Sequence, residues 1–132
     1  MKLIDDSRCF VCGKNNRIGL KLNIKRDNES HKAWAVTKIN SRFCGWAGVV
    51  HGGIISTVLD EIMAYAAFTV YDSGVTGEIC VRFRKPIPTE REILIEGFIE
   101  SSKGRVLYTK GTITMDGELM AESTGKMVMV KK

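Results

Sequence analysis

The stretch VVHGGIISTVLDEIMAYAAF, residues 49–68, contains a histidine and two glycines followed by a long apolar run. The run predicts a helix from about residue 53 to residue 71, with Gly74 as its stop, and apolar side chains occur on nearly every face of that helix. A helix that is apolar nearly all round must be surrounded by other elements. Asp60 lies in its middle, and a carboxylate at that position needs an explanation.

Runs with the period of β-strands occur on both sides of this helix. Two precede it, at residues 19–26 and 31–39, and residues 1–17 are predicted to be an irregular lead-in. Four follow it, at residues 78–85, 92–101, 105–115 and 119–130, and Asp116 with Gly117 predicts a tight hairpin between the last two. We therefore expect an α+β fold in which an antiparallel sheet, its last four strands a meander, wraps around one long central helix. Helix surface left uncovered would need a partner subunit.

Length and composition limit the possible classes of protein. A chain of 132 residues predicts a single domain, residues 1–132. No stretch reaches the roughly 18 uncharged apolar residues of a membrane span, and the acidic start MKLIDD lacks the apolar core of a signal peptide. We expect a cytoplasmic protein that does not act at a membrane and keeps its four cysteines as thiols. The net charge of +5 is spread without a polybasic run, which favours a small polyanion over a nucleic acid.

The helix start has the chemistry of an anion site. Its first backbone N–H groups have no partner within the helix, and glycine lets a ligand approach them. Gly52 and Gly53 are therefore candidate donors for an oxyanion. Asp60 follows Gly52 by eight residues, about 12 Å along a helix, so the two cannot act on one carbonyl within one chain. If both serve one site, two helices must run antiparallel across a dimer interface.

A purely structural interpretation of the same residues stays open. Asp60 and Glu61 would then form a solvated stripe, and His51 would only cap the helix.

Several segments resemble one family. HGGIISTVLDE, with an acid nine positions after the histidine, resembles the motif of the hotdog-fold acyl-CoA thioesterases, in the branch of the phenylacetate-pathway enzymes and the human thioesterase superfamily members. CFVCG with GLKL, TGEICVRFRKPIP and SSKGR resemble further segments of that family. The resemblance implies dimers with a continuous sheet, possible dimers of dimers, interfacial active sites and acyl-CoA as the substrate. CoA enters as part of the substrate, so no cofactor is expected.

The resemblance also implies roles for particular residues. Asp60 matches the catalytic carboxylate, as nucleophile or as general base, and Thr76 matches the hydroxyl that orients it. Gly52 matches the backbone donor that polarises the thioester carbonyl, with Gly53 beside it, and His51 matches a positioning residue.

One departure concerns the position six residues before the motif histidine. Some members of the family carry asparagine or glutamine there, near the substrate carbonyl, whereas this chain has Gly45. We therefore expect no side-chain contribution to the oxyanion site from this position.

Basic residues at strand ends are candidates for binding the CoA phosphates. We expect these contacts from Arg84, Lys85, Lys103 and Arg105, with Gly104 in the same turn as the last two. A solvated sheet face is the alternative for each of them.

Three other functions are compatible with parts of the sequence. Cys9 and Cys12 form a C-x-x-C that, with Cys44 and Cys80, suggests a zinc ribbon in a basic nucleic-acid-binding module. Zinc sites usually pair two such motifs, and the other two cysteines are single, so we expect no metal. A non-catalytic acyl-CoA-binding domain is the second alternative. A hydratase or dehydratase is the third, although His31 is the only further histidine.

Overall fold

The apolar run after His51 forms helix α1, Gly52–Ala67, in the computed structural model, which describes residues 2–130. The helix is enclosed along most of its length, as its composition requires. Its buried residues are Ile55, Val58, Leu59, Ile62, Met63, Ala64, Ala66 and Ala67. These side chains form the centre of the hydrophobic core.

The helix ends earlier than predicted. The Thr69 hydroxyl donates to the Ala66 carbonyl at 2.7 Å, and the N–H groups of Thr69 and Val70 donate to carbonyls only three residues back. These tighter turns close the helix after Ala67. Gly74 was wrongly predicted as the stop, because it is the first residue of a strand.

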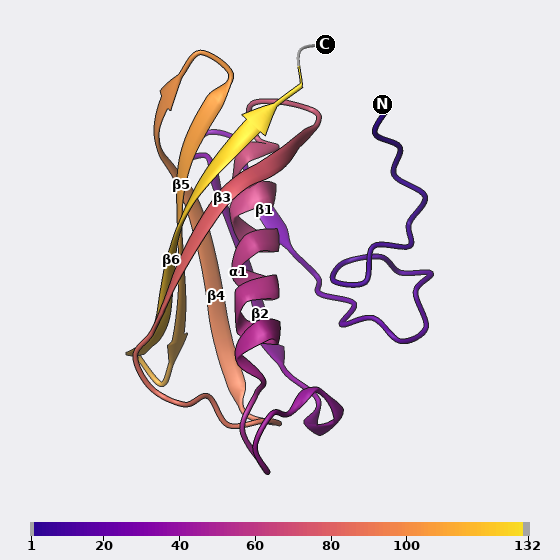
Figure 1. Cartoon of the computed structure of the whole chain (residues 1–132), viewed down its shortest axis with the longest axis vertical. Coiled ribbons are helices and arrows are strands. Elements are labelled where there is room, and N and C mark those ends of the chain that lie inside the picture. Colours follow the sequence, from indigo (N-terminus) through magenta and orange to yellow (C-terminus); the bar gives the residue numbers. More distant parts are fainter. Residues whose placement is uncertain (1, 131–132) are drawn as a thin grey trace.

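Six strands form one antiparallel sheet around α1 (Figure 1). Their bounds are β1 Lys25–Asp27, β2 Lys32–Lys38, β3 Gly74–Phe83, β4 Glu92–Lys103, β5 Val106–Met115 and β6 Glu118–Met129, and a short 3-10 helix, η1, covers Ser41–Phe43. The predicted hairpin at Asp116 and Gly117 is confirmed, since both residues have positive φ, at 51° and 79°. The predicted sheet wrapped around one helix is also confirmed.

The predicted four-stranded meander is wrong in one pairing, because the order in the sheet is β1-β2-β4-β5-β6-β3. The segment between β3 and β4 is held at the start of α1, where Ile87 is buried and its carbonyl accepts a hydrogen bond from Val50 N–H at 2.8 Å. From there the chain runs across the sheet and begins β4 on the side of β5 that faces away from β6 (Figure 1). As a result, β4 pairs with β2, and β3 pairs with β6.

The first predicted strand is also shorter than expected. Only Lys25–Asp27 of the stretch around residues 19–26 is a strand. Leu20 and Leu22 instead donate their N–H groups to the carbonyls of Phe10 and Val11, at 2.7 and 2.8 Å. The lead-in is therefore irregular, as predicted, but it pairs with this stretch and keeps it out of the sheet.

Close packing of α1 on the sheet depends on Gly97 in β4. A Cβ atom there would lie 2.7 Å from the Ile62 carbonyl oxygen, which belongs to the helix backbone and cannot turn aside. Gly97→Ala is therefore expected to lower the free energy of unfolding by about 1–3 kcal/mol, because the helix must move off the sheet. Urea denaturation at a fixed protein concentration measures this loss.

Gly77→Ala is the matched control, because a Cβ atom at Gly77 would meet Val128 Cγ2 at an ordinary 3.4 Å. Equal stability of the two variants would contradict this account of the packing.

No helix within residues 2–130 is long and apolar enough to cross a membrane.

Candidate active site

The carboxylate in the middle of α1 meets a hydroxyl from the edge strand β3. Thr76 Oγ1 donates to Asp60 Oδ1 at 2.6 Å and lies 3.2 Å from Met127 Sδ. Both Asp60 and Thr76 are half-buried. Among residues 2–130, Asp60 Oδ2 has no hydrogen-bond partner. One oxygen of the carboxylate, Oδ1, is therefore fixed by Thr76, and the other, Oδ2, is available to a ligand.

The bond to Thr76 fixes the direction in which Asp60 points. Thr76→Val removes the donor and keeps a similar side-chain shape, so we expect the rate of the reaction that depends on the Asp60 carboxylate to fall about 10–100-fold, the effect of losing a hydrogen bond to a charged group. Steady-state kinetics at saturating substrate measures the change. Thr76→Ser retains the hydroxyl and is expected to lose much less; comparable rates for the two variants would remove Thr76 from the site.

The start of α1 separates the roles of its two glycines. His51 caps the helix, and its Nδ1 accepts a hydrogen bond from Gly53 N–H at 2.8 Å. The Gly53 amide is therefore occupied. The Gly52 amide has no partner within residues 2–130, and the Gly52 residue is exposed. The sequence alone predicted both glycines as ligand-binding residues. The geometry favours the Gly52 N–H as the donor to an oxyanion, because the Gly53 N–H already bonds to His51.

Two neighbours shape the approach to Gly52. Phe83 at the end of β3 places its ring 3.6 Å from where a Gly52 Cβ would lie, a contact that the sequence did not indicate. A Cβ at Gly45 would lie 3.3 Å from His51 Cα, a tight contact. Gly45 therefore packs closely against the residue that caps the helix, and a larger side chain at this position would press on His51.

Gly52 and Asp60 do not converge within one chain. Helix α1 is continuous from Gly52 to Ala67, which keeps the two residues about 12 Å apart. The helix-facing side of β3 between them is incompletely covered, since Ile79 is 37% exposed and Phe83 is 57% exposed. β3 is also an edge strand with one unpaired side. The site is thus open at the place where a second sheet edge can join.

The predicted phosphate-binding residues fall into two groups. At the end of β3, Arg84 Nε contacts Glu122 at 2.9 Å and Lys85 Nζ contacts Glu118 at 2.6 Å. Both pairs are largely exposed, so each stabilises the fold little and can be exchanged for another anion.

The second group surrounds the turn between β4 and β5, where Gly104 has a φ of 60° between Lys103 and Arg105. Both groups can be placed relative to strand β6. Lys103 pairs with Val106 of β5, which in turn pairs with Val128 of β6. The N–H groups of Arg84 and Lys85 donate to the Met120 carbonyl, and Met120 lies eight residues before Val128 on β6. The two groups are therefore about 27 Å apart along the sheet. A single chain does not bring them together.

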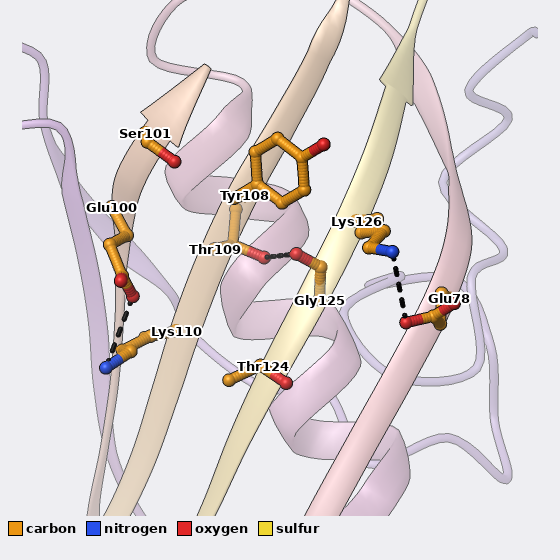
Figure 2. A pocket seen from close by; sticks show the side chains of 9 residues that line it. All are labelled: Glu78, Glu100, Ser101, Tyr108, Thr109, Lys110, Thr124, Gly125 and Lys126. Atoms are coloured by element: carbon orange, nitrogen blue, oxygen red, sulfur yellow. Dashed lines mark hydrogen bonds and ion pairs between the residues drawn. The ribbon is translucent and has the colours of Figure 1, made fainter. Parts of the chain in front are cut away.

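A shallow pocket of about 270 Å³ lies on the face of the sheet opposite α1 (Figure 2). Two ion pairs, Lys110 with Glu100 and Lys126 with Glu78, neutralise its charges. Thr109 Oγ1 is buried and bonds to the Gly125 carbonyl at 3.3 Å, so this hydroxyl is not exposed in the pocket. The sheet separates this pocket from Asp60, and none of the predicted site residues lines it.

The zinc-ribbon interpretation is wrong for the described part of the chain, because the four cysteines do not assemble. Cys80 lies on β3 opposite Thr124, and Cys44 lies in the loop before α1. The hydratase interpretation gains no support either: His31 bonds to Thr69 Oγ1 at 2.9 Å, beyond the C-terminal end of α1.

An antiparallel sheet around one helix, with a carboxylate in mid-helix and an open amide at the helix start, defines the class of hotdog-fold thioesterases. The family model described as Thioesterase superfamily matches residues 47–122, more than half of the chain, and the chain belongs to this family.

Two curated relatives match part of the chain. The Acyl-coenzyme A thioesterase THEM4 of Xenopus laevis is 25% identical over 87 residues, which cover 66% of this chain and 39% of that protein. An uncharacterized mitochondrial protein of Candida albicans (strain WO-1) is 32% identical over 66 residues, which cover 48% of this chain and 30% of that protein. The match thus spans less than half the length of either relative.

Solved structures share the fold at low identity. A thioesterase superfamily protein has a TM-score of 0.86 at 23% identity, over 92% of this chain and 63% of that one. A hypothetical thioesterase of Streptococcus pneumoniae TIGR4, solved with coenzyme A, has a TM-score of 0.75 at 20% identity, over 83% of this chain and 90% of that one. The same protein was solved with an aspartate changed to alanine and, separately, with a threonine sixteen positions later changed to alanine. The hotdog fold expected from the sequence is confirmed.

Proposed function

We propose that this protein is an acyl-CoA thioesterase that hydrolyses a thioester to a free acid and CoA, as a homodimer that can pair into a dimer of dimers. Each active site takes Asp60 and Thr76 from one subunit and the Gly52 N–H from the partner subunit. The observation that carries this proposal is the pair of unsatisfied groups on one helix. Asp60 Oδ2 and the Gly52 amide both lack a partner among the described residues 2–130, yet they are about 12 Å apart in one chain.

An antiparallel arrangement of two α1 helices brings these groups together twice. Each helix start then lies against the middle of the other helix, so two equivalent sites form about a two-fold axis. The uncovered Ile79 and Phe83 beside the unpaired edge of β3 supply apolar area for such an interface.

The chemistry requires only these groups. In the general-base route, Asp60 takes a proton from water while the water oxygen bonds to the carbonyl carbon and the carbonyl π pair moves onto oxygen. The tetrahedral oxyanion, stabilised by the partner's Gly52 N–H, then collapses and breaks the C–S bond. The CoA thiolate leaves with the electron pair and receives the proton.

In the nucleophile route, an Asp60 oxygen bonds to the carbonyl carbon, the C–S bond breaks and the CoA thiolate leaves with the electron pair. Water then hydrolyses the resulting anhydride, which releases the free acid and restores the Asp60 carboxylate, and the proton released by water goes to the thiolate. Single-turnover hydrolysis in heavy-oxygen water tests for the nucleophile route, because label enters the Asp60 carboxyl group only when water attacks the Asp60 carbon of this anhydride. Neither route uses a cofactor.

The comparisons support the substrate class and the residue pair. The S. pneumoniae structure contains coenzyme A, and THEM4 is named an acyl-coenzyme A thioesterase. Asp60 and Thr76 are also an aspartate and a threonine sixteen positions apart, as in the two variants of the S. pneumoniae protein. Across a dimer, Arg84 and Lys85 of one subunit together with Lys103 and Arg105 of the other would meet the CoA phosphates.

The test is a hydrolysis screen over short, long and aromatic acyl-CoAs, with the released thiol detected by a chromogenic reagent. We expect turnover of at least one acyl class, lost in Asp60→Asn. Tight acyl-CoA binding without turnover would replace this proposal with the non-catalytic binding domain.

A cytoplasmic location, with no nucleic-acid or membrane partner, is also part of the proposal. Because the Candida relative is called mitochondrial, imaging of a tagged chain is the direct check of this location.

A further inference from the structure

The lead-in brings two thiols onto α1 at a carboxylate that the proposed hydrolysis does not use. Cys9 Sγ, Cys12 Sγ and a carboxylate oxygen of Glu61 all lie within 4.8 Å of one another. Cys9 Sγ donates to Glu61 Oε2 at 3.2 Å, across 52 positions of sequence. Glu61 faces this loop, whereas its neighbour Asp60 bonds to Thr76 on β3. The two carboxylates therefore belong to different faces of the helix.

The loop that carries the thiols is closely packed around Gly13. The Gly13 N–H donates to the Cys9 carbonyl at 2.7 Å, and a Cβ at Gly13 would lie 2.5 Å from both the nitrogen and the oxygen of Cys9. Asn16 Nδ2 adds a bond to the Arg8 carbonyl at 3.0 Å. This backbone holds both thiols of the C-x-x-C on the side that faces Glu61, before any ligand arrives.

Among residues 2–130, Glu61 forms no ion pair, and both thiols lie beside its carboxylate. Arg26 lines the same pocket as these groups, but its guanidinium lies over the Tyr65 ring, 5.6 Å from the centroid. A bound divalent cation would supply the missing positive charge.

We propose that Cys9, Cys12 and Glu61 bind a zinc-class divalent cation that fastens the lead-in to α1. Two thiolates and one carboxylate are three of the four ligands of a tetrahedral zinc ion, with Zn–S near 2.3 Å and Zn–O near 2.0 Å. In that geometry the sulfur atoms are about 3.8 Å apart, which the separations within 4.8 Å accommodate. Binding releases the two thiol protons to solvent.

The fourth position is open to a neighbouring pocket. All three ligands line a pocket of about 820 Å³ between the lead-in and the C-terminal half of α1. A water molecule from that pocket would complete the coordination. The sequence alone led to the opposite expectation, because it shows two thiols in one motif and gives no sign that Glu61 meets them.

The first test measures binding on the full chain, reduced and stripped of metal. We expect about one Co²⁺ per chain, with thiolate-to-cobalt charge-transfer absorption, and displacement of Co²⁺ by Zn²⁺. Cys9→Ser and Cys12→Ser are expected to weaken zinc binding about 100-fold or more. Cys44→Ser and Cys80→Ser remove thiols outside the cluster and are the matched controls, with unchanged binding.

Glu61→Gln keeps both thiols and the size of the side chain, so it tests the third ligand even if a cysteine variant does not fold. We expect Glu61→Gln to weaken zinc binding at least about 10-fold. The proposal is overturned if the reduced wild-type chain takes up no metal, if the cobalt complex lacks thiolate absorption, or if binding is the same in Cys12→Ser as in the controls.

A second readout follows the fastening of the lead-in. Trypsin can cut after Arg8, Lys14 and Arg17, which are exposed residues of the thiol-bearing loop. Zinc is expected to slow these cuts at least about tenfold, because cleavage requires local opening of the bound state. Cutting after Lys103 and Arg105, in the distant β4–β5 turn, is the internal control. Equal cutting of the loop with and without zinc would show that the ion does not fasten it.

Discussion

Asp60→Asn is expected to lower kcat/KM for acyl-CoA hydrolysis by about 10²–10⁴-fold while leaving the folded dimer intact. The amide cannot take a proton from water and is a poor nucleophile, so both routes of hydrolysis lose the group that starts them. Asparagine has the shape of aspartate and can still accept the hydrogen bond of Thr76 through its oxygen. Initial rates, with size-exclusion chromatography and circular dichroism on the same samples, measure the effect.

Asp116→Asn is the matched control for this substitution. Asp116 is exposed in the β5–β6 turn with a φ of 51°, and its contact is an ion pair with Arg91. Asparagine tolerates that backbone conformation, so activity and fold should both be preserved. Wild-type turnover by Asp60→Asn would remove Asp60 from the mechanism and leave the structural interpretation of the helix.

Gly52→Pro is the second large expected effect, a loss of about 10²–10³-fold in kcat, because proline has no N–H to offer the oxyanion. The position suits proline unusually well. Gly52 is the first residue of α1, where proline is favoured, and His51 has φ −59° and ψ 135°, the conformation that precedes proline. The substitution therefore deletes one donor and keeps the helix.

Gly52→Ala is the comparison that isolates the N–H. Its Cβ would meet the Phe83 ring at an ordinary 3.6 Å, and the amide remains. We expect Gly52→Ala to lose far less activity than Gly52→Pro. Equal losses would show that bulk at this position, and not the donor, is what matters.

Co-expression of Asp60→Asn with Gly52→Pro tests whether the site is shared between subunits. In a mixed dimer, one site holds Asp60 and Gly52 intact and the other site holds both substitutions. With random pairing we expect about one quarter of wild-type activity, because half of the dimers are mixed and each has one working site. If both residues served a site within one chain, no mixture of the two inactive variants would recover activity.

Local patterns in the sequence were enough for most of the secondary structure. The apolar period identified α1, alternation identified β2 and β4 to β6, and Asp116 with Gly117 identified the last hairpin, since each signal depends on neighbours along the chain. The spacing of Gly52 and Asp60 on one helix also implied that the two residues are too far apart to share a site in one chain.

The sequence by itself therefore determined a helix that needs a covering sheet, the residues that open that helix, and the carboxylate in its middle. Only the tertiary structure decided that β3 pairs with β6, that the Gly53 amide is taken by His51 and that Glu61 meets Cys9 and Cys12. It also brings Thr76 to Asp60, a pairing that only the family resemblance had implied. These outcomes join segments far apart in the chain, or depend on which of two adjacent amides a side chain occupies. Periodicity carries no information about such contacts, because they are set by how the whole core packs.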